Sequence, residues 1–263
     1  MSADSHAILS RLSVVECERR TRLATPGLEA RVAAVKRYQQ LRFSHTYADL
    51  LKSPRYGPAS LFFLDELYGP ADFTRRDAQF ARMVPALTRL FPDEIVDTVA
   101  TLSELHALSE TLDTRMGQHL DEAQTVSAQA YVLAWQATGR PTDRADQIRF
   151  TLAVASRLDR LTRKSLLRNS LRLMRGPARA AGLADLQRFL ELGFDTFRAM
   201  KGASEFMSTI DSRERELANA LFSATDITGV NPAAPVWSLL PPDPPHADSL
   251  DVHGRPPRST LEP

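Results

Sequence analysis

The 263-residue sequence lacks several features that would assign it to a familiar class of protein. Cys17 is the only cysteine, which excludes intramolecular disulfide bonds and zinc modules built from several cysteines. No run of about 18 apolar residues occurs, and residues 1–20 contain no continuous apolar segment like that of a secretory signal. We therefore expect a cytoplasmic protein without a membrane-spanning helix.

An excess of charge of one sign is also missing. The sequence has 33 Lys and Arg and 32 Asp and Glu, which gives a formal net charge of +1. A nearly neutral chain has no overall attraction for nucleic acids or anionic membranes, so any such surface must be local. Apolar residues make up 43% and charged residues 25%, as in an ordinary globular protein.

Motifs of several enzyme classes are absent as well. The sequence has no His-Glu-x-x-His, Gly-x-Ser-x-Gly or Gly-x-x-x-x-Gly-Lys-Ser/Thr pattern, and it lacks the paired Glu-x-x-His motifs of di-iron bundles. Cys17 has no evident base to activate it, so we expect an inert helix residue. We accordingly predict no catalytic residue, no metal and no cofactor.

Helical periodicity is what the sequence does contain. Apolar residues recur at three- and four-residue spacing, whereas the alternation typical of strands is scarce. Pro and Gly fall mostly between these periodic segments, except for Pro85, which we expect to kink its helix. The sequence predicts an all-α domain over residues 1–224, an irregular bundle of about eight or nine helices. The expected helices lie near residues 4–23, 28–43, 58–68, 75–90, 93–121, 123–138, 143–175, 183–201 and 204–223.

The composition changes at about residue 225. Residues 225–263 hold nine of the seventeen prolines and show no helical stripe, so we predict a flexible, proline-rich tail. Trp237, Leu239 and Leu240 are too apolar for a simple spacer. We expect them to dock either on the bundle of the same chain or on another protein.

The densest charge lies in residues 144–179, which carry ten Lys or Arg and only two acids. On one long helix, the cations would share a stripe, with Leu166 and Leu173 on the opposite side. We therefore predict an amphipathic helix with a basic outer face. The candidate interaction stripe consists of Arg157, Arg160, Lys164, Arg168, Arg172 and Arg175.

Three kinds of anion could match this stripe. The simplest is internal, because residues 93–122 carry eight acids against one arginine and could form a neighbouring helix. An acidic protein partner and a phosphate-rich polymer are the alternatives, since arginine matches phosphate oxygens well. Nucleic acid is the least favoured, because the stripe lacks the aromatic residues that stack on unpaired bases.

Two acids, Asp65 and Glu66, interrupt the apolar run "SLFFLDELYG" at residues 60–69. A buried carboxylate without a cation is costly, so we expect arginines such as Arg75 and Arg76 to pair with these acids. The alternative is a carboxyl with a raised pKa that acts as a general acid or base.

His106 is the strongest single candidate for chemistry. It projects within an apolar helical stripe, with Asp113 at nearly the same azimuth and Glu110 four residues away. A histidine paired with a carboxylate could serve as a base or a metal ligand, although a hydrogen-bonded core histidine is the simpler interpretation. The candidate pocket of this alternative comprises Asp65, Glu66, His106 and Asp113.

These patterns favour a non-enzymatic interaction or regulatory protein, with the basic stripe or the tail as its contact surface. Its partner would be another protein, and self-association stays open. One alternative is a helical enzyme or small-ligand binder that uses the candidate pocket. A second alternative is a polyanion binder that uses the basic stripe.

The run Phe62-Phe63-Leu64-Asp65-Glu66-Leu67-Tyr68 resembles the motif of the bacterial FFLEELY-motif proteins, with Asp65 in place of a glutamate. The segments "RRDAQFARMVPALTRLFP", "LSELHALSETLD" and "RGPARAAGLADLQRFLELGFDTFRAM" are similar to the same family. The resemblance covers most of residues 40–222 and implies no activity, cofactor or residue role. The change at Asp65 keeps the charge and shortens the side chain, which a salt bridge tolerates better than catalysis.

Overall fold

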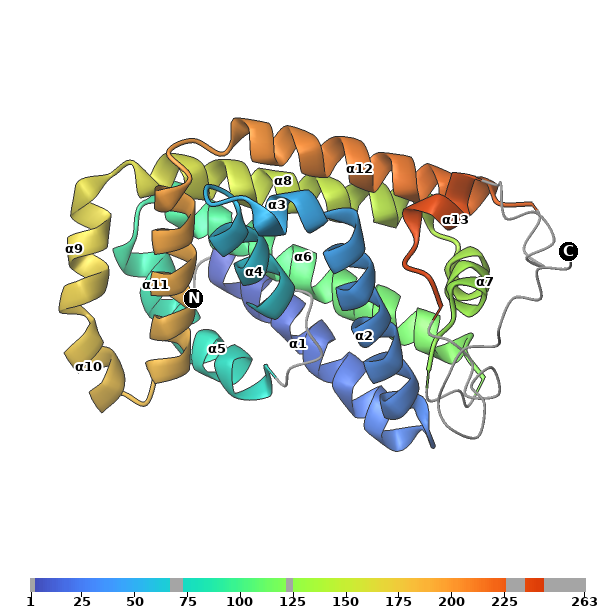
Figure 1. The fold of residues 1–263 in the computed structure, drawn as a ribbon. Coiled ribbons are helices and arrows are strands. Elements are labelled where there is room, and N and C mark those ends of the chain that lie inside the picture. Colours follow the sequence, from blue (N-terminus) through green and yellow to red (C-terminus); the bar gives the residue numbers. More distant parts are fainter. Residues whose placement is uncertain (1–2, 67–72, 122–124, 226–234, 244–263) are drawn as a thin grey trace, which may run out of the picture.

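The computed structural model describes residues 3–66, 73–121, 125–225 and 235–243, and all regular structure in them is helical (Figure 1). The prediction of an all-α bundle is therefore confirmed. The helices are α1 (Ala3–Ala24), α2 (Leu28–Thr46), α3 (Ala48–Lys52), α4 (Gly57–Glu66), α5 (Thr74–Leu90), α6 (Asp93–Gln118), α7 (Ala128–Thr138), α8 (Pro141–Thr162), α9 (Ser165–Leu173), α10 (Arg175–Ala180), α11 (Ala184–Ala199), α12 (Ser204–Ser223) and α13 (Pro235–Leu239).

The long helix α6 connects the parts of the bundle, because it packs against α1, α2, α7 and α8. The helices α8 and α12 lie side by side, and α11 packs across α4, α5 and α8 (Figure 1). The helices α9 and α10 lie at one end of the molecule, and α7 and α13 lie at the other. None of the described helices is both long and apolar enough to cross a membrane.

Buried apolar residues form three clusters. One joins α2, α7, α12 and α13 and includes Tyr131 and Leu221, which are 1% and 0% exposed. A second joins α4, α11 and α12 through aromatic rings that include Phe63 and Phe206. The third holds α1 against α5 and α6. Several small cores in place of one leave room for polar side chains between them.

Close contact between α2 and α6 depends on Gly117. A Cβ atom at this position would lie 2.5 Å from Cγ2 of Val32, so any larger residue would push the two helices apart. The close approach brings Lys36 and Gln39 of α2 opposite acids of α6.

The expected helix over residues 143–175 is not continuous. Helix α8 ends at Thr162, and Lys164 has the extended dihedral angles φ −83° and ψ 102°, so α9 and α10 start in a new direction. The break is stabilised by the Asp159 carboxylate, which accepts hydrogen bonds from Arg163 and from the backbone N–H of Ala203. Turning the chain here lets α9 and α10 pack against α11.

The tail also departs from the prediction where the structure describes it. Residues 235–239 form α13, although the sequence shows no helical stripe there. Leu240 is 2% exposed, and Trp237 and Leu239 pack against the cluster of α2, α7 and α12. The carboxylate of Asp243 accepts a hydrogen bond from the N–H of Ala128 at 2.7 Å. Residues 235–243 therefore contact their own bundle, whereas 226–234 and 244–263 lie outside the described residues.

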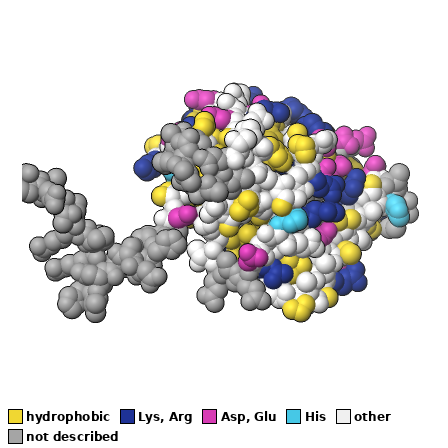
Figure 2. All heavy atoms as spheres, turned by 90° about the vertical axis from the view of Figure 1, so that its right-hand side faces the viewer, with side chains coloured by type: hydrophobic (Ala, Val, Ile, Leu, Met, Phe, Trp, Pro, Cys, Tyr) yellow, Lys and Arg dark blue, Asp and Glu magenta, His cyan; other side chains and the backbone are white. Residues whose placement is uncertain are grey.

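The surface at the α7 and α13 end carries both signs of charge. Basic and acidic side chains are scattered among apolar ones over this face (Figure 2). This mixture agrees with the net charge of +1.

Candidate ligand-binding cavity

A cavity of about 180 Å³ lies between the helices, and α2, α4, α5, α6, α8 and α11 contribute most of its wall. Aromatic rings such as Phe62, Phe80 and Phe189 make much of the wall apolar. Charged side chains converge on the same space, which is the usual composition of a small-molecule site. Among the described residues, the carboxylates of the wall are Glu66, Asp77, Glu110, Asp113 and Glu214, and the cations are Lys36, Arg42, Arg76 and Arg144.

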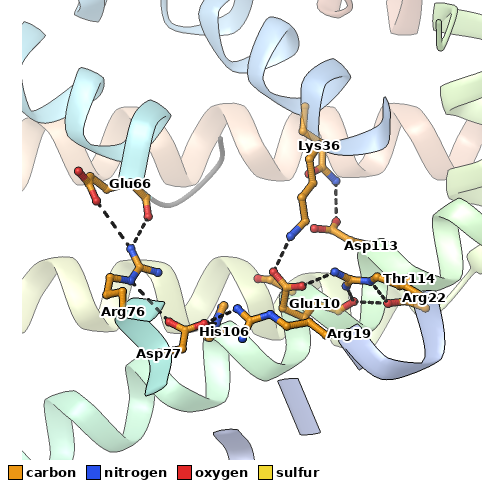
Figure 3. Close-up of polar contacts among 12 residues, drawn as sticks. Arg19, Arg22, Lys36, Glu66, Arg76, Asp77, His106, Glu110, Asp113 and Thr114 are labelled. Atoms are coloured by element: carbon orange, nitrogen blue, oxygen red, sulfur yellow. Dashed lines mark hydrogen bonds and ion pairs between the residues drawn. The ribbon is translucent and has the colours of Figure 1, made fainter. Parts of the chain in front are cut away.

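His106 is paired with a carboxylate, but the partner is Asp77 of α5. Its Nε2 atom lies 2.9 Å from Oδ2 of Asp77, an oxygen that also accepts a hydrogen bond from Arg19 (Figure 3). Burial alone would raise the pKa of Asp77, but the hydrogen bonds and charges of His106, Arg19 and Arg76 lower it to about 2. Asp77 is thus a carboxylate that orients the imidazole in the cavity wall.

Glu110 of α6 is held by two cations from other helices. Its Oε2 lies 2.7 Å from Arg22 of α1, and its Oε1 lies 2.6 Å from Nζ of Lys36 of α2 (Figure 3). Burial would raise the pKa of Glu110, but Lys36 and Arg22 outweigh it and lower the pKa to about 2. The three charges therefore tie α1, α2 and α6 together at one wall of the cavity.

Asp65 and Glu66 lie in different environments. Glu66 is 6% exposed, with Oε1 2.7 Å from Arg188 and Oε2 3.7 Å from Arg76. Asp65 is exposed and does not line the cavity. The predicted arginine partner is therefore present for Glu66, whereas Arg75 pairs with Asp185 instead.

Asp113 is the most isolated carboxyl in the wall. It is 6% exposed, and its Oδ1 accepts a hydrogen bond of 2.9 Å from Nε2 of Gln39. Burial is the largest influence on Asp113 and raises its pKa above the ordinary value for an aspartate, despite the opposing charges of Lys36 and Arg144. Asp113 and His106 both line the cavity, but Asp113 bonds to Gln39 and His106 bonds to Asp77.

Arg144 of α8 also lines the cavity. Its guanidinium lies over the ring of Trp135, with 3.8 Å from Cζ to the ring centroid, and it donates a hydrogen bond to Gln147. Arg42 nearby pairs with Glu214. The charges of Lys36 of α2 and Arg144 of α8 both act on Asp113, although neither forms a described ion pair with it.

The basic stripe is arranged differently from the prediction. Arg168 and Arg175 face acids of α11, at 2.9 Å from Asp195 and 2.6 Å from Glu191. The side chains of Leu166 and Leu173, expected on the inner side, are each 79% exposed. The prediction of a basic outer face is therefore wrong for α9, because the break after α8 turns its cations towards α11.

The first half of the stripe contacts the acidic helix α6. Lys164 and Arg160 both lie close to Glu94, and Arg157 donates a hydrogen bond of 2.7 Å to the carbonyl of Asp97. Arg172 has no ion pair among the described residues. Most of the candidate stripe is thus neutralised by neighbouring helices.

Sequence reasoning missed several residues that complete the cavity. Asp77 and Arg19 carried no pattern that linked them to His106, because they lie on helices far apart in the sequence. Gln39 and Arg144 were equally inconspicuous, since one is an amide and the other is one of the ten basic residues in 144–179. In the described ranges, no three His, Cys, Asp or Glu side chains converge as a metal site.

Comparison with known proteins identifies the family of the chain. Residues 18–227 match the family described as a domain of unknown function, DUF8198, and the chain belongs to that family. No curated protein and no solved structure matches the chain significantly.

Proposed function

We propose that this member of the DUF8198 family binds a small organic molecule in the cavity between α2, α4, α5, α6, α8 and α11. The single observation that carries the proposal is a cavity of about 180 Å³ in which apolar walls and charged side chains meet. A cavity of about 150 Å³ in another protein accommodates benzene, so this space suits a molecule of similar or slightly larger size.

Binding, and not catalysis, is the activity that we propose. The Asp77 carboxylate that orients His106 also pairs with Arg19 and Arg76, so it balances charge as well as holding the imidazole. The described hydrogen bonds of the His106 side chain include no hydroxyl or thiol that it could activate.

A fragment screen with matched variants tests this function. We expect Leu102→Phe, which places a ring in the cavity wall, to weaken fragment binding at least tenfold in calorimetric titrations. The same substitution at Leu133, which is 48% exposed on α7 and outside the wall, should leave binding unchanged. Fragments that bind all three proteins equally, or a screen without any binder, would contradict the proposal.

A second candidate function is binding of a partner protein by α9, and the exposed side chains of Leu166 and Leu173 favour it. Arg179 of α10 is exposed and has no ion pair among the described residues, so the matching partner surface is apolar with a carboxylate at its edge. This is the interaction role predicted from the sequence, moved from the basic stripe to the apolar face. We also propose that the protein is bacterial and cytoplasmic and that it is related to the FFLEELY-motif proteins.

Peptide selection tests this second function. We expect acidic, amphipathic peptides selected on the full chain to lose at least tenfold in affinity for the double variant Leu166→Ser, Leu173→Ser, measured by fluorescence anisotropy. Leu23→Ser is the control, since Leu23 is 76% exposed on α1. Equal loss in both proteins, or self-association in place of peptide binding, would contradict it.

A further inference from the structure

The charged side chains of the cavity wall already have partners within the protein. Four of the five described carboxylates belong to ion pairs, and Asp113 accepts a hydrogen bond from Gln39. Arg144 donates a hydrogen bond to Gln147. A charged ligand would have to separate such a pair to gain a counterion, and separation of a buried pair is costly. The ion pairs join Glu66 to Arg76 and Arg188, Asp77 to Arg19 and Arg76, Glu110 to Arg22 and Lys36, and Glu214 to Arg42.

His106 differs from these residues, because one of its ring nitrogens is not used by any described residue. The other nitrogen, Nε2, lies 2.9 Å from Oδ2 of Asp77 (Figure 3). Nδ1 has no hydrogen-bond partner in the described ranges. The imidazole lines the cavity, and its side chain is 20% exposed. His106 is therefore held in place through one nitrogen, and the second is available to a bound molecule.

A hydroxyl group is the partner that suits Nδ1 in either protonation state of the imidazole. In the neutral ring with its proton on Nε2, which faces the Asp77 carboxylate, Nδ1 is an acceptor, and in the charged ring it is a donor. A hydroxyl both donates and accepts hydrogen bonds. Recognition of a hydroxyl therefore does not depend on the charge of His106, whereas recognition of a carboxylate requires the charged ring.

The apolar part of the wall favours an aromatic ring. The rings of Phe62 and Phe189 lie there with their centroids 5.5 Å apart, and Phe80 contributes a further ring. Aromatic rings attract one another in tilted and edge-to-face arrangements at such separations, in addition to the burial of their apolar area. The volume of about 180 Å³ exceeds that of the cavity of about 150 Å³ that binds benzene, which leaves room for one small substituent.

We propose that the ligand is a small phenol, whose ring packs against Phe62, Phe80 and Phe189 and whose hydroxyl bonds to Nδ1 of His106. This inference rests on the proposed function, and it specifies the chemistry of the ligand. Because a phenol has a pKa of about 10, it is neutral at pH 7 and leaves the ion pairs of the wall intact. A hydrocarbon of the same shape would leave Nδ1 without a hydrogen bond, and an acid or an amine would bring a charge into the wall.

Probes with one six-membered ring test the inference by titration calorimetry on the full chain at pH 7. Phenol and toluene have nearly the same shape and differ in the hydroxyl, whereas benzoate and benzylamine are charged. We expect phenol to bind at least about fivefold more tightly than toluene and about tenfold more tightly than the charged probes. A purely apolar cavity would favour toluene, since a hydroxyl without a partner is costly to bury. Cyclohexanol, which has the hydroxyl without the aromatic ring, should bind more weakly than phenol.

Variants of His106 separate its hydrogen bond from the shape of the cavity. His106→Phe keeps a ring and removes both nitrogens, so the preference for phenol over toluene should reverse. His106→Asn places an amide near the position of Nδ1 and should retain the preference for phenol. The control is His119→Phe, which should behave like the wild type, because His119 is exposed at the end of α6 and outside the wall. The two affinities are compared within each protein, so a general change of the cavity cancels.

Nitrogen NMR of the wild-type protein tests the same contact without a substitution. The signal of Nδ1 in His106, identified by its absence in His106→Asn, should shift much further on addition of phenol than on addition of toluene. A hydrogen bond changes the electron density of the nitrogen, whereas packing of a ring beside it does so only weakly. Equal shifts with both probes would overturn the contact with His106.

The outcomes distinguish this inference from the proposed function. Toluene, benzoate or benzylamine as the tightest probe, equal binding of cyclohexanol and phenol, or a preference for phenol that persists in His106→Phe would overturn the phenol while leaving the cavity as a binding site. Binding of other fragments but none of these probes would also overturn it. Failure of every fragment and probe would instead overturn the proposed function itself.

Discussion

The cavity wall and the α9–α10 end of the molecule both contain ion pairs between arginine and a carboxylate. The pairs at the wall are buried, whereas those at the α9–α10 end are exposed to solvent. At the wall, the side chains of Arg22 and Glu110 are 4% and 7% exposed. At the far end, the pair of Arg168 and Asp195 is 32% and 49% exposed. Arginine and carboxylate therefore hold helices together in both regions, but water competes with the second pair and hardly reaches the first.

The apolar residues of the two regions differ in the same sense. In the cavity wall, Phe62 and Phe197 are 5% and 1% exposed, whereas Leu166 and Leu173 of α9 face solvent although they form a helical stripe. The helix α9 has its charged side towards α11, so an amphipathic pattern alone does not say which side is inside. The comparison predicts that similar substitutions have very different effects in the two regions.

The largest effect is expected from removal of a buried charge. Glu110→Gln leaves Arg22 and Lys36 without their carboxylate, and loss of one member of a buried pair costs about 3–5 kcal/mol. The exposed counterpart Asp195→Asn should change stability by less than about 1 kcal/mol. Urea unfolding at pH 7 measures both, and equal losses would remove the distinction between the regions.

Lowering the pH should weaken the buried ion pairs of Glu110. The pKa of Glu110 is lowered from its ordinary value of 4.5 to about 2 in the folded protein, so its stabilising contribution is present above pH 4.5 and lost as the pH falls towards 2. The shift corresponds to about 3 kcal/mol at most. Unfolding free energies between pH 6 and 2 should fall less steeply in Glu110→Gln than in the wild type, and parallel curves would contradict the pairing.

A smaller difference in stability is expected between a leucine of the tail and a leucine of α9. Leu240→Ala should destabilise the protein by about 2 kcal/mol, because Leu240 is 2% exposed against the cluster of α2, α7 and α12. Leu173→Ala removes the same atoms from a side chain that is 79% exposed, so its effect should stay within about 0.5 kcal/mol. Thermal unfolding of both variants checks this, and an unchanged melting temperature in Leu240→Ala would show that the tail does not stabilise the bundle.

Local patterns determined the helical fold. Apolar spacing and the positions of Pro and Gly depend on neighbours a few residues away, which is why most helices lie close to the predicted ranges. The same short range explains why Glu66 was correctly matched with Arg76, since the two are ten residues apart and joined by one connection.

Only the tertiary structure decided the rest, because the deciding partners lie far away in the sequence. Asp77 replaced Asp113 as the partner of His106 because α5 packs beside α6, and α9 exposed its leucines because the break at Lys164 turned its cations towards α11. Helix periodicity records which residues share a face, but the neighbour that covers this face is set by the packing of the whole chain.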